Sequence, residues 1–119
     1  MKLQKVYTSL LTADLEVAEG WYTNFLGRRP DNRPMDTLVQ WEFSGQAGLA
    51  ISNDDKLAGK GAMFLQVDDV AVERQRLESL GISLGEDIKG DYSTLAQVRD
   101  PDGNILTLAT PPSPPFPPA

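Results

Sequence analysis

Apolar and polar residues alternate along KVYTSLLTA, residues 5–13, and this two-residue period predicts a strand. Asp14 follows at the place where a helix N-cap is expected. From Leu15 the apolar residues recur at helical spacing as far as Leu26, and Gly27 supplies the left-handed residue that commonly ends a helix. This part of the chain is therefore predicted to form a strand and then a helix of about three turns.

The next segment, RRPDNRPM (28–35), combines proline with charged residues and predicts a loop. TLVQWEF (37–43) and GLAIS (48–52) show the two-residue period again and predict two strands. Ser44 and Gly45 lie between them and are typical of a hairpin turn, so we expect the two strands to pair.

The same order of elements returns in the second half of the chain. AMFLQV (62–67) predicts a strand, Asp69 an N-cap, and Gly81 the end of a second helix. The apolar residues expected on one face of that helix are Val70, Leu77 and Leu80. TLAQVR (94–99) and NILTLAT (104–110) then predict strands on either side of the turn DPDG.

The two sets of strand, capped helix and glycine are offset by about 55 residues, which indicates two βαβββ modules. One such module cannot bury both faces of its strands alone, so the two must share a sheet or exchange partners in a dimer. With 119 residues and 13.0 kDa, the chain suits one domain. We expect it over residues 1–110, with module one at about 1–55 and module two at about 58–110.

Residues 111–119 form a proline-rich tail that cannot extend a sheet, because proline has no amide hydrogen to donate. We expect an extended segment that is either a solvated end or lies on a surface through Phe116. Recognition of this tail by a proline-binding domain is the alternative interpretation.

Histidine and cysteine are both absent, which excludes Ser-His-Asp and Cys-His catalysis, disulfides and thiolate metal sites. The net charge of −6, without a basic stripe, disfavours binding to nucleic acid or to an anionic membrane and favours a neutral or cationic ligand. No apolar run reaches the length of a membrane span, and the N-terminus lacks the pattern of a signal peptide. We therefore expect a cytoplasmic protein.

Several motifs together resemble the vicinal oxygen chelate superfamily, the group of glyoxalases, bleomycin resistance proteins and extradiol dioxygenases. They are TADLEVAEGWYTNFLGRRP in the first module, and VDDVAVERQRLESLG and DPDGNILTL in the second. The resemblance covers nearly all of residues 5–110. It implies an α+β fold in which two βαβββ modules form a curved, mostly antiparallel eight-stranded sheet, with the helices outside and a cavity inside.

In the metalloenzymes of that superfamily, four strand positions supply the metal ligands. Under the resemblance these positions are Tyr7, Ala50, Ala62 and Thr107. Two methyl groups have no lone pairs to offer, and a neutral hydroxyl is a poor ligand without anionic partners. The resemblance therefore points to a branch without metal or other cofactor, in which Thr107 replaces an acidic ligand.

The two-residue period divides the strands into two chemically different faces. The face of the four positions is small, polar or aromatic and carries Tyr7, Ser9, Gly48, Ala50, Ser52, Ala62, Phe64, Gln66, Ile105 and Thr107. The other face is aliphatic and carries Val6, Leu10, Leu49, Ile51, Met63, Leu65, Val67, Leu106 and Leu108. The first suits the lining of a wet cavity and the second suits packing against helices.

Two aromatic residues of the hairpin extend the expected cavity. If the hairpin closes through residues 44–47, Phe43 lies opposite Gly48 and Trp41 opposite Ala50, so that both rings overhang the cavity. The rings would then offer a stacking platform to a flat ligand. Filling of the core or of a dimer interface by the same rings is the alternative.

The leading hypothesis is a metal-free small-molecule binding protein of the bleomycin-resistance type, a homodimer that sequesters a planar aromatic compound, neutral or cationic, as in antibiotic resistance. The expected ligand-binding residues are Tyr7, Ser9, Trp41, Phe43, Phe64, Gln66, Tyr92 and Thr107. Tyr92 would close the cavity mouth, or else be an ordinary loop residue.

The alternative hypothesis is a glyoxalase-like lyase, or another enzyme of this superfamily, that works without the usual His/Glu metal site. Tyr7 or Glu42 would then be its acid or base. No lysine is predicted beside Tyr7 to make its phenol a better base, and no catalytic residue is assigned under the leading hypothesis.

Overall fold

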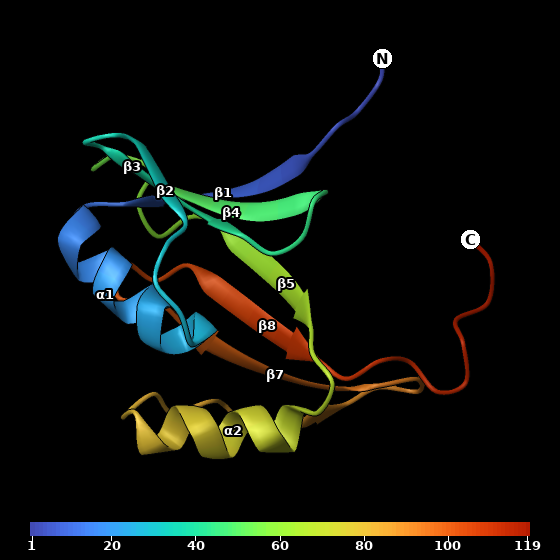
Figure 1. The fold of residues 1–119 in the computed structure, drawn as a ribbon. Coiled ribbons are helices and arrows are strands. Elements are labelled where there is room, and N and C mark those ends of the chain that lie inside the picture. Colours follow the sequence, from blue (N-terminus) through green and yellow to red (C-terminus); the bar gives the residue numbers. More distant parts are fainter. The chain divides into compact units, whose positions relative to one another are not determined.

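The computed structural model describes residues 1–119 and divides into two compact units. The first unit comprises residues 1–62 and 99–105, and the second comprises residues 63–98 and 106–119. Each unit has one helix and its own four-stranded sheet, so the two predicted βαβββ modules are present (Figure 1). No helix combines the length and the apolar character that crossing a membrane requires.

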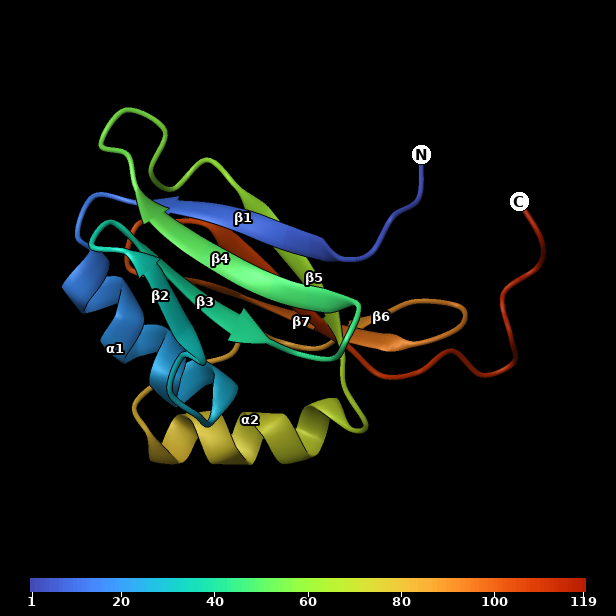
Figure 2. The same cartoon turned by 45° about the horizontal axis from the view of Figure 1, so that its top comes forward.

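The first unit contains one helix and four strands in a mixed sheet. Its elements are β1 (Val6–Thr12), α1 (Leu15–Leu26), β2 (Asn32–Met35), β3 (Leu38–Glu42) and β4 (Ala47–Asn53). The strand order is β1-β4-β3-β2, and Figure 2 shows these strands side by side. β1 runs parallel to β4, whereas β3 pairs antiparallel with both β4 and β2.

Helix α1 begins and ends as its sequence predicts. The Asp14 side chain accepts a hydrogen bond from the Val17 amide at 3.2 Å, which satisfies one of the free donors of the first turn. Gly27 has φ of 81° and donates its N–H to the Thr23 carbonyl at 3.0 Å. A side chain at that φ would be strained, so glycine fixes the last turn.

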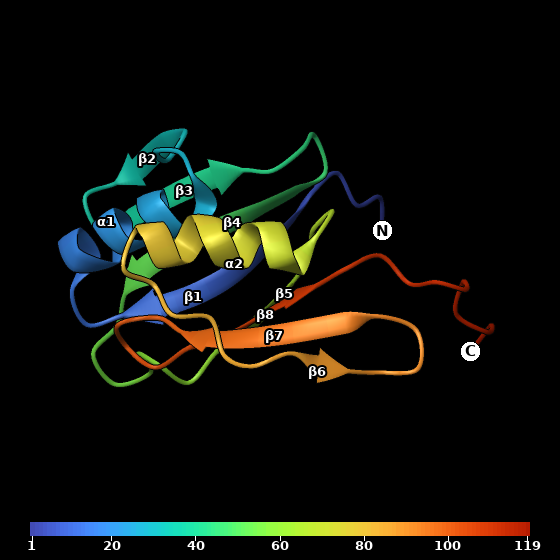
Figure 3. The same cartoon turned by 90° about the horizontal axis from the view of Figure 1, so that it is seen from below.

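The second unit repeats this arrangement. Its elements are β5 (Ala62–Gln66), α2 (Val70–Ser79), β6 (Ile88–Lys89), β7 (Thr94–Arg99) and β8 (Ile105–Ala109), in the strand order β5-β8-β7-β6. Figure 3 shows the short β6 alongside β7. Asp69 caps α2 by accepting from the Ala71 amide at 2.8 Å, and Gly81 follows the helix with φ of 81°. Both features confirm the sequence prediction.

Three details of the sequence prediction are wrong. Residues 32–35 form strand β2 within the expected loop, but all four are exposed and Pro34 interrupts the ladder, so no alternation marked them. Strand β6 has only two residues, also exposed, and was not predicted. Leu80 is 46% exposed, because α2 ends at Ser79 and Leu80 lies beyond its buried face.

The proline-rich tail belongs to the second unit and makes contacts there. The Ser113 amide donates to the Tyr92 carbonyl at 2.7 Å, and the Phe116 ring lies 5.1 Å from the Tyr92 ring, centroid to centroid. The tail therefore follows a surface through Phe116, one of the two arrangements expected from the sequence.

The buried carboxylate of Asp100 organises the turn DPDGN in the first unit. Its Oδ1 accepts hydrogen bonds from the amides of Asp102, Gly103 and Asn104 at 2.9–3.0 Å. Its Oδ2 accepts from the Tyr22 hydroxyl and the Asn104 side-chain amide, both at 2.7 Å. A buried charge is stable only when it is hydrogen-bonded in this way, so Asp100 explains why Tyr22 and the turn occur together.

We predict that Tyr22→Phe destabilises the protein at neutral pH by about 1–3 kcal/mol, because one acceptor of a buried carboxylate loses its donor. Burial, the hydrogen bond to Asp100 and the negative charges of Asp100 and Asp102 raise the pKa of Tyr22 above its ordinary value of 10.0. The unfolded chain therefore releases this proton first as the pH rises past that value. The wild type should lose about 1.4 kcal/mol of stability between neutral pH and pH 11 through this group, and the Phe variant should not.

Urea unfolding followed by tryptophan fluorescence at several pH values from 7 to 11 measures this effect. The difference in unfolding free energy between the two proteins should shrink as the pH rises. A difference that stays constant up to pH 11 would show that the phenol titrates alike in the folded and unfolded chains.

Candidate functional site

The first sheet has one face covered by α1 and one that α1 does not cover. Trp41 faces the helix, since its ring lies 6.2 Å from that of Tyr22 in α1, and it lies opposite Leu49 in the β3–β4 ladder. Val39 and Ile51 form another opposed pair on this side, and both are buried. We call the other side of the sheet the open face.

Side chains on the open face form three rows across β1, β4 and β3. The strand registers place Tyr7, Gly48 and Glu42 in one row, Ser9, Ala50 and Gln40 in the next, and Leu11, Ser52 and Leu38 in the third. All of these residues except Gly48 and Ser9 are half-buried, whereas the helix-facing residues between them on β3 and β4 are buried. This alternation confirms the division into faces predicted for β4, whereas on β1 Leu10 is buried as predicted but Val6 is 59% exposed.

The registers also correct the expected position of Trp41. The Phe43 amide donates to the Ala47 carbonyl at 2.9 Å, so the turn has three residues, 44–46, instead of the four that were assumed. A shift of one residue moves every side chain of a strand to the other face. Trp41 is consequently fully buried, with its indole N–H donating to the Arg28 carbonyl at 2.9 Å, and it cannot stack on a ligand.

Glu42 lies opposite Gly48, the place on the open face that Phe43 was expected to occupy, and Gln40 takes the place expected for Trp41 opposite Ala50. Its Oε1 accepts a hydrogen bond from the Tyr7 hydroxyl at 2.6 Å and another from the Asn32 side-chain amide at 3.2 Å. Its Oε2 forms an ion pair with the Lys5 ammonium, which also lies 4.9 Å from the centroid of the Tyr7 ring. A carboxylate, an ammonium and a phenol are thus gathered at one end of the face.

Gly48 makes this arrangement possible. A Cβ added at Gly48 would stand 2.7 Å from Tyr7 Cε1 and 2.7 Å from the Trp41 carbonyl oxygen, closer than atoms can approach. The absence of a side chain lets the Tyr7 ring lie over β4 and reach Glu42 on the far side of that strand. Glycine is therefore required here by close approach of the ring.

A cavity of about 240 Å³ adjoins the open face at the β1 edge. It is lined by Ser9 and Leu11 of β1 together with Leu57, Lys60 and Gly61 from the segment that follows β4. Ser9 is exposed, so its hydroxyl is available to a ligand. This cavity gives the open face an apolar end, opposite the charged end at Glu42.

The second sheet presents the other predicted site residues. Phe64 is 63% exposed on β5, and Gln66 on the same strand is also exposed. Thr107 is 9% exposed on β8, and its hydroxyl accepts a hydrogen bond from the Gln97 side-chain amide at 3.1 Å. The Thr107 hydroxyl thus forms a hydrogen bond that links the side chains of the neighbouring strands β7 and β8.

The two remaining predicted site residues lie outside the strands. Phe43 follows the end of β3 and is 38% exposed. Tyr92, in the loop between β6 and β7, is half-buried and contacts the tail through Phe116. Its observed partner is therefore the chain's own C-terminal segment.

The four positions that hold metal in the resembling enzymes do not fit a metal in this chain. The Tyr7 proton is donated to Glu42, Thr107 accepts from Gln97, and Ala50 and Ala62 have only methyl groups. Neutral oxygens and methyl groups lack the charge that a divalent ion requires of its ligands. No group of three or more acidic, histidine or cysteine side chains suited to a metal ion occurs elsewhere in the chain.

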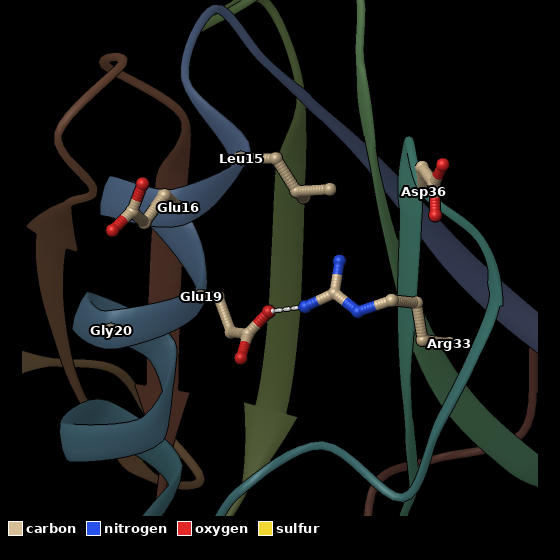
Figure 4. Close-up of a pocket in the computed structure, with 6 residues that line it drawn as sticks. All are labelled: Leu15, Glu16, Glu19, Gly20, Arg33 and Asp36. Atoms are coloured by element: carbon tan, nitrogen blue, oxygen red, sulfur yellow. Dashed lines mark hydrogen bonds and ion pairs between the residues drawn. The ribbon is translucent and has the colours of Figure 1, made fainter.

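A second depression, of about 470 Å³, lies between α1 and β2. It is lined by Leu15, Glu16, Glu19, Gly20, Arg33 and Asp36. Figure 4 shows Glu19 and Arg33 facing one another across it, joined by an ion pair. Its only cation is thus already paired with one of its carboxylates, and the remaining charged groups are exposed.

Sequence reasoning missed Lys5 and Asn32 and placed Glu42 on the wrong face. A signal for Lys5 was available, because it stands two residues before Tyr7 and side chains at that spacing share a face of an extended chain. Asn32 carried no such signal, since it belongs to the unpredicted strand β2.

The order of elements, the two βαβββ units and the strand order within each sheet define the glyoxalase/bleomycin resistance fold, an α+β fold. Similar solved structures confirm it. A glyoxalase/bleomycin resistance protein from Catenulispora acidiphila superposes with a TM-score of 0.84 at 21% identity, over 92% of this chain and 99% of that one. The predicted fold, which is that of the vicinal oxygen chelate superfamily, is thus confirmed.

Two further solved structures share this fold and differ from one another in function. TnmS3, an antibiotic binding protein from a Streptomyces species, gives a TM-score of 0.74 at 21% identity, over 90% of this chain and 94% of that one. A lactoylglutathione lyase from Agrobacterium tumefaciens gives 0.73 at 23% identity, over 88% and 91%. Neither the protein-family models nor the curated proteins gave a match to this sequence.

We predict that Gly48→Ala destabilises the protein by about 1–3 kcal/mol, because the added methyl group displaces the Tyr7 ring and crowds the Trp41 carbonyl. Gly20→Ala is the matched control. Gly20 is exposed in α1 and has open space around it, so alanine there should stabilise the helix by about 0.5–1 kcal/mol. Urea unfolding of both variants measures the two effects, and equal effects would contradict the role assigned to Gly48.

Proposed function

We propose that this chain is a metal-free binding protein that sequesters a small, planar aromatic molecule on the open face of its first sheet. One observation carries the proposal: the open face of β4 has only the small residues Gly48, Ala50 and Ser52. These residues make a flat floor, and the neighbouring strands raise larger side chains on both sides of it.

The free part of this floor suits a planar ring. Residues at alternate positions of a strand are about 6.6 Å apart, so the part that the Tyr7 ring leaves uncovered, from Ala50 to Ser52, is about 7 Å long, and the Tyr7 ring itself lies over Gly48. Tyr7 and Ser9 border it on the β1 side, and Gln40 and Glu42 border it on the β3 side. A planar molecule can lie on such a floor and have its polar groups oriented by hydrogen bonds from the borders.

The apolar and charged ends of the face give the ligand a direction. Leu11 and Leu38 flank Ser52, and the cavity near Leu57 continues that end, whereas the Glu42 carboxylate lies at the other. A ligand with a hydrophobic part and one polar group would satisfy both ends. An antibiotic binding protein among the structures of this fold supports the class of ligand, a small organic molecule.

The second unit has proposed ligand contacts of its own, at Phe64, Gln66, Tyr92 and Thr107, and Phe43 is a further proposed contact in the first unit. The strong exposure of Phe64 supports a stacking role, since a phenylalanine with 63% of its surface exposed has most of its ring free. Thr107 would act by orienting the Gln97 amide, to which it is hydrogen-bonded.

We predict that Ala50→Phe abolishes binding of planar probes, because the new ring covers the centre of the floor. Ala47→Phe is the control. It adds the same ring to the same strand, at an exposed position whose side chain points to the other face of the sheet. Fluorescence titration with the planar cation proflavine and the planar neutral compound 9-anthracenemethanol measures the affinity, and circular dichroism checks that both variants fold.

At least one of the two probes should bind the wild type and the Ala47 variant alike, and bind the Ala50 variant at least about tenfold more weakly, a loss of about 1.4 kcal/mol. If the probes bind both variants equally well, the floor is not the surface on which the ligand binds. Mass spectrometry of the recovered probe should find it chemically unchanged, as sequestration requires.

A metal-free enzyme is the second candidate, and one contact favours it. The Tyr7 hydroxyl donates to the Glu42 carboxylate at 2.6 Å, with the Lys5 ammonium beside both. The phenol thus has a proton acceptor within hydrogen-bonding distance, as an acid–base group requires. The lactoylglutathione lyase with the same fold makes lyase chemistry the reaction class to test for this candidate.

We also propose that the chain forms a homodimer. Large apolar side chains stand on the surface, among them Val6, Met35, Leu57 and Phe64, each more than half exposed. Exposed apolar groups of this kind favour burial against a partner. Sedimentation equilibrium should give a mass of twice 13.0 kDa. A mass that stays at that of one chain at all accessible concentrations would rule out the dimer.

A further inference from the structure

Lys5 occupies a site that has the chemistry of a cation receptor. Its ammonium lies 4.9 Å from the centroid of the Tyr7 ring and forms an ion pair with Glu42 Oε2. An aromatic face next to a carboxylate is a favourable environment for an ammonium group, whether the group belongs to a side chain or to a ligand. The receptor is formed by Tyr7 and Glu42, and at present the chain itself fills it.

The receptor part of this arrangement is fixed. The Tyr7 hydroxyl and the Asn32 amide both hold Glu42 Oε1, and the Arg28 guanidinium donates to the Glu42 carbonyl. Gly48 gives the Tyr7 ring its position beside the carboxylate. Because these contacts come from β1, β2, β4 and the loop after α1, the carboxylate is oriented before any ligand arrives.

The backbone of Lys5 lies outside the sheet, whereas Tyr7 and Glu42, which receive its ammonium, belong to strands. It precedes β1, and residues 1–5 form no helix or strand. The first ladder bond of this end of the chain is donated by the following residue, from the Val6 amide to the Gln46 carbonyl. Its ammonium contacts Glu42 and the Tyr7 ring, and its side chain is 23% exposed. Because Lys5 lies outside the ladder, its ammonium can be displaced by movement of the N-terminal segment and its side chain, with the strands unchanged.

Glu42 Oε2 needs a cation at this place. The atom is enclosed and has no hydrogen-bond donor apart from its ion-pair partner, Lys5. A buried carboxylate oxygen without a partner is costly, so a departing lysine must be replaced by another positive group. The site thus selects for the charge of the replacement.

We propose that Lys5 is an exchangeable internal counter-ion and that the Tyr7–Glu42 receptor takes the ammonium group of the ligand in its place. This inference rests on the proposed function and deepens it, since it names the ligand class as a planar aromatic amine or quaternary ammonium compound. Gly48 lies between Tyr7 and Glu42 in the same row, so a cation bound there leaves the ring system of the ligand over Ala50 and Ser52. Adjacent parts of one face then recognise two features of the ligand. The Tyr7–Glu42 receptor binds its charge, and the floor binds its planar ring system.

Lys5→Gln tests the exchange directly, because glutamine keeps the chain length and removes the competing charge. We expect proflavine to bind this variant about tenfold more tightly than the wild type, since the loss of an internal cation of this type is worth about that much. The neutral 9-anthracenemethanol should bind both proteins equally. Lys2→Gln is the matched control: it removes the same charge from the exposed N-terminal segment and should leave both affinities unchanged.

The double variant Lys5→Gln/Glu42→Gln supplies the second comparison. It removes the carboxylate charge while glutamine can still accept the Tyr7 hydroxyl hydrogen, and it should lose the gain in proflavine affinity. Unchanged or weaker binding of proflavine to Lys5→Gln, with the neutral probe still bound, would overturn the exchange and leave the binding function standing. If the planar anion anthraquinone-2-sulfonate binds the wild type but not Lys5→Gln, Lys5 is a receptor for anions. That result would equally overturn the proposed exchange.

A small, non-planar cation separates the receptor from the floor. Tetraethylammonium should raise the melting temperature of Lys5→Gln and leave that of the double variant unchanged, whether or not any planar probe binds. If neither planar probe binds the wild type, the proposed function fails, and this melting experiment still decides on the receptor. Absence of any rise for Lys5→Gln would reject it.

Discussion

The buried carboxylate of Asp100 is the interaction on which the geometry of the first unit depends. It joins the turn DPDGN to α1 through the Tyr22 hydroxyl, and it orients Asn104 within the same turn. Asn104 then donates to the Leu11 carbonyl at the end of β1 and accepts from the Gly61 amide. Through Asn104, one charged group thereby helps to position the strand that carries Tyr7 and Ser9.

The second carboxylate of the turn strengthens this connection. Asp102 accepts from the Thr12 hydroxyl at 2.5 Å and from the Ala13 amide at 2.9 Å, where β1 passes into the cap of α1. Gly59 permits the approach, since a Cβ there would lie 2.0 Å from the Asp102 carbonyl oxygen. The turn DPDGN therefore has a structural role, since it connects α1 with β1. Both of its carboxylates accept hydrogen bonds from backbone and side-chain donors.

Sequence alone was sufficient where the signal is local. Asp14 and Gly27 are recognisable because a cap and a left-handed residue are properties of single positions, and both faces of β4 follow from a strict two-residue period. The hairpin register was not local in this sense, since a turn of three residues and one of four both accommodate Ser44 and Gly45, and the choice moves Trp41 between core and surface. The Tyr22–Asp100 contact spans 78 residues, and no pattern in one sequence connects the two.

That single register difference changes the chemistry of the site. With Trp41 in the core, the open face has Glu42 at its border, and a stacking platform of two rings gives way to a flat floor with a charged end. Recognition then depends less on aromatic surface and more on a carboxylate whose partners are already in place. The metal positions of the resembling enzymes are neutral in this chain, whereas the open face of the first sheet retains the Glu42 carboxylate, whose enclosed Oε2 is paired with Lys5. Affinity for a cation can arise here by displacement of Lys5 alone, without any rearrangement of the strands.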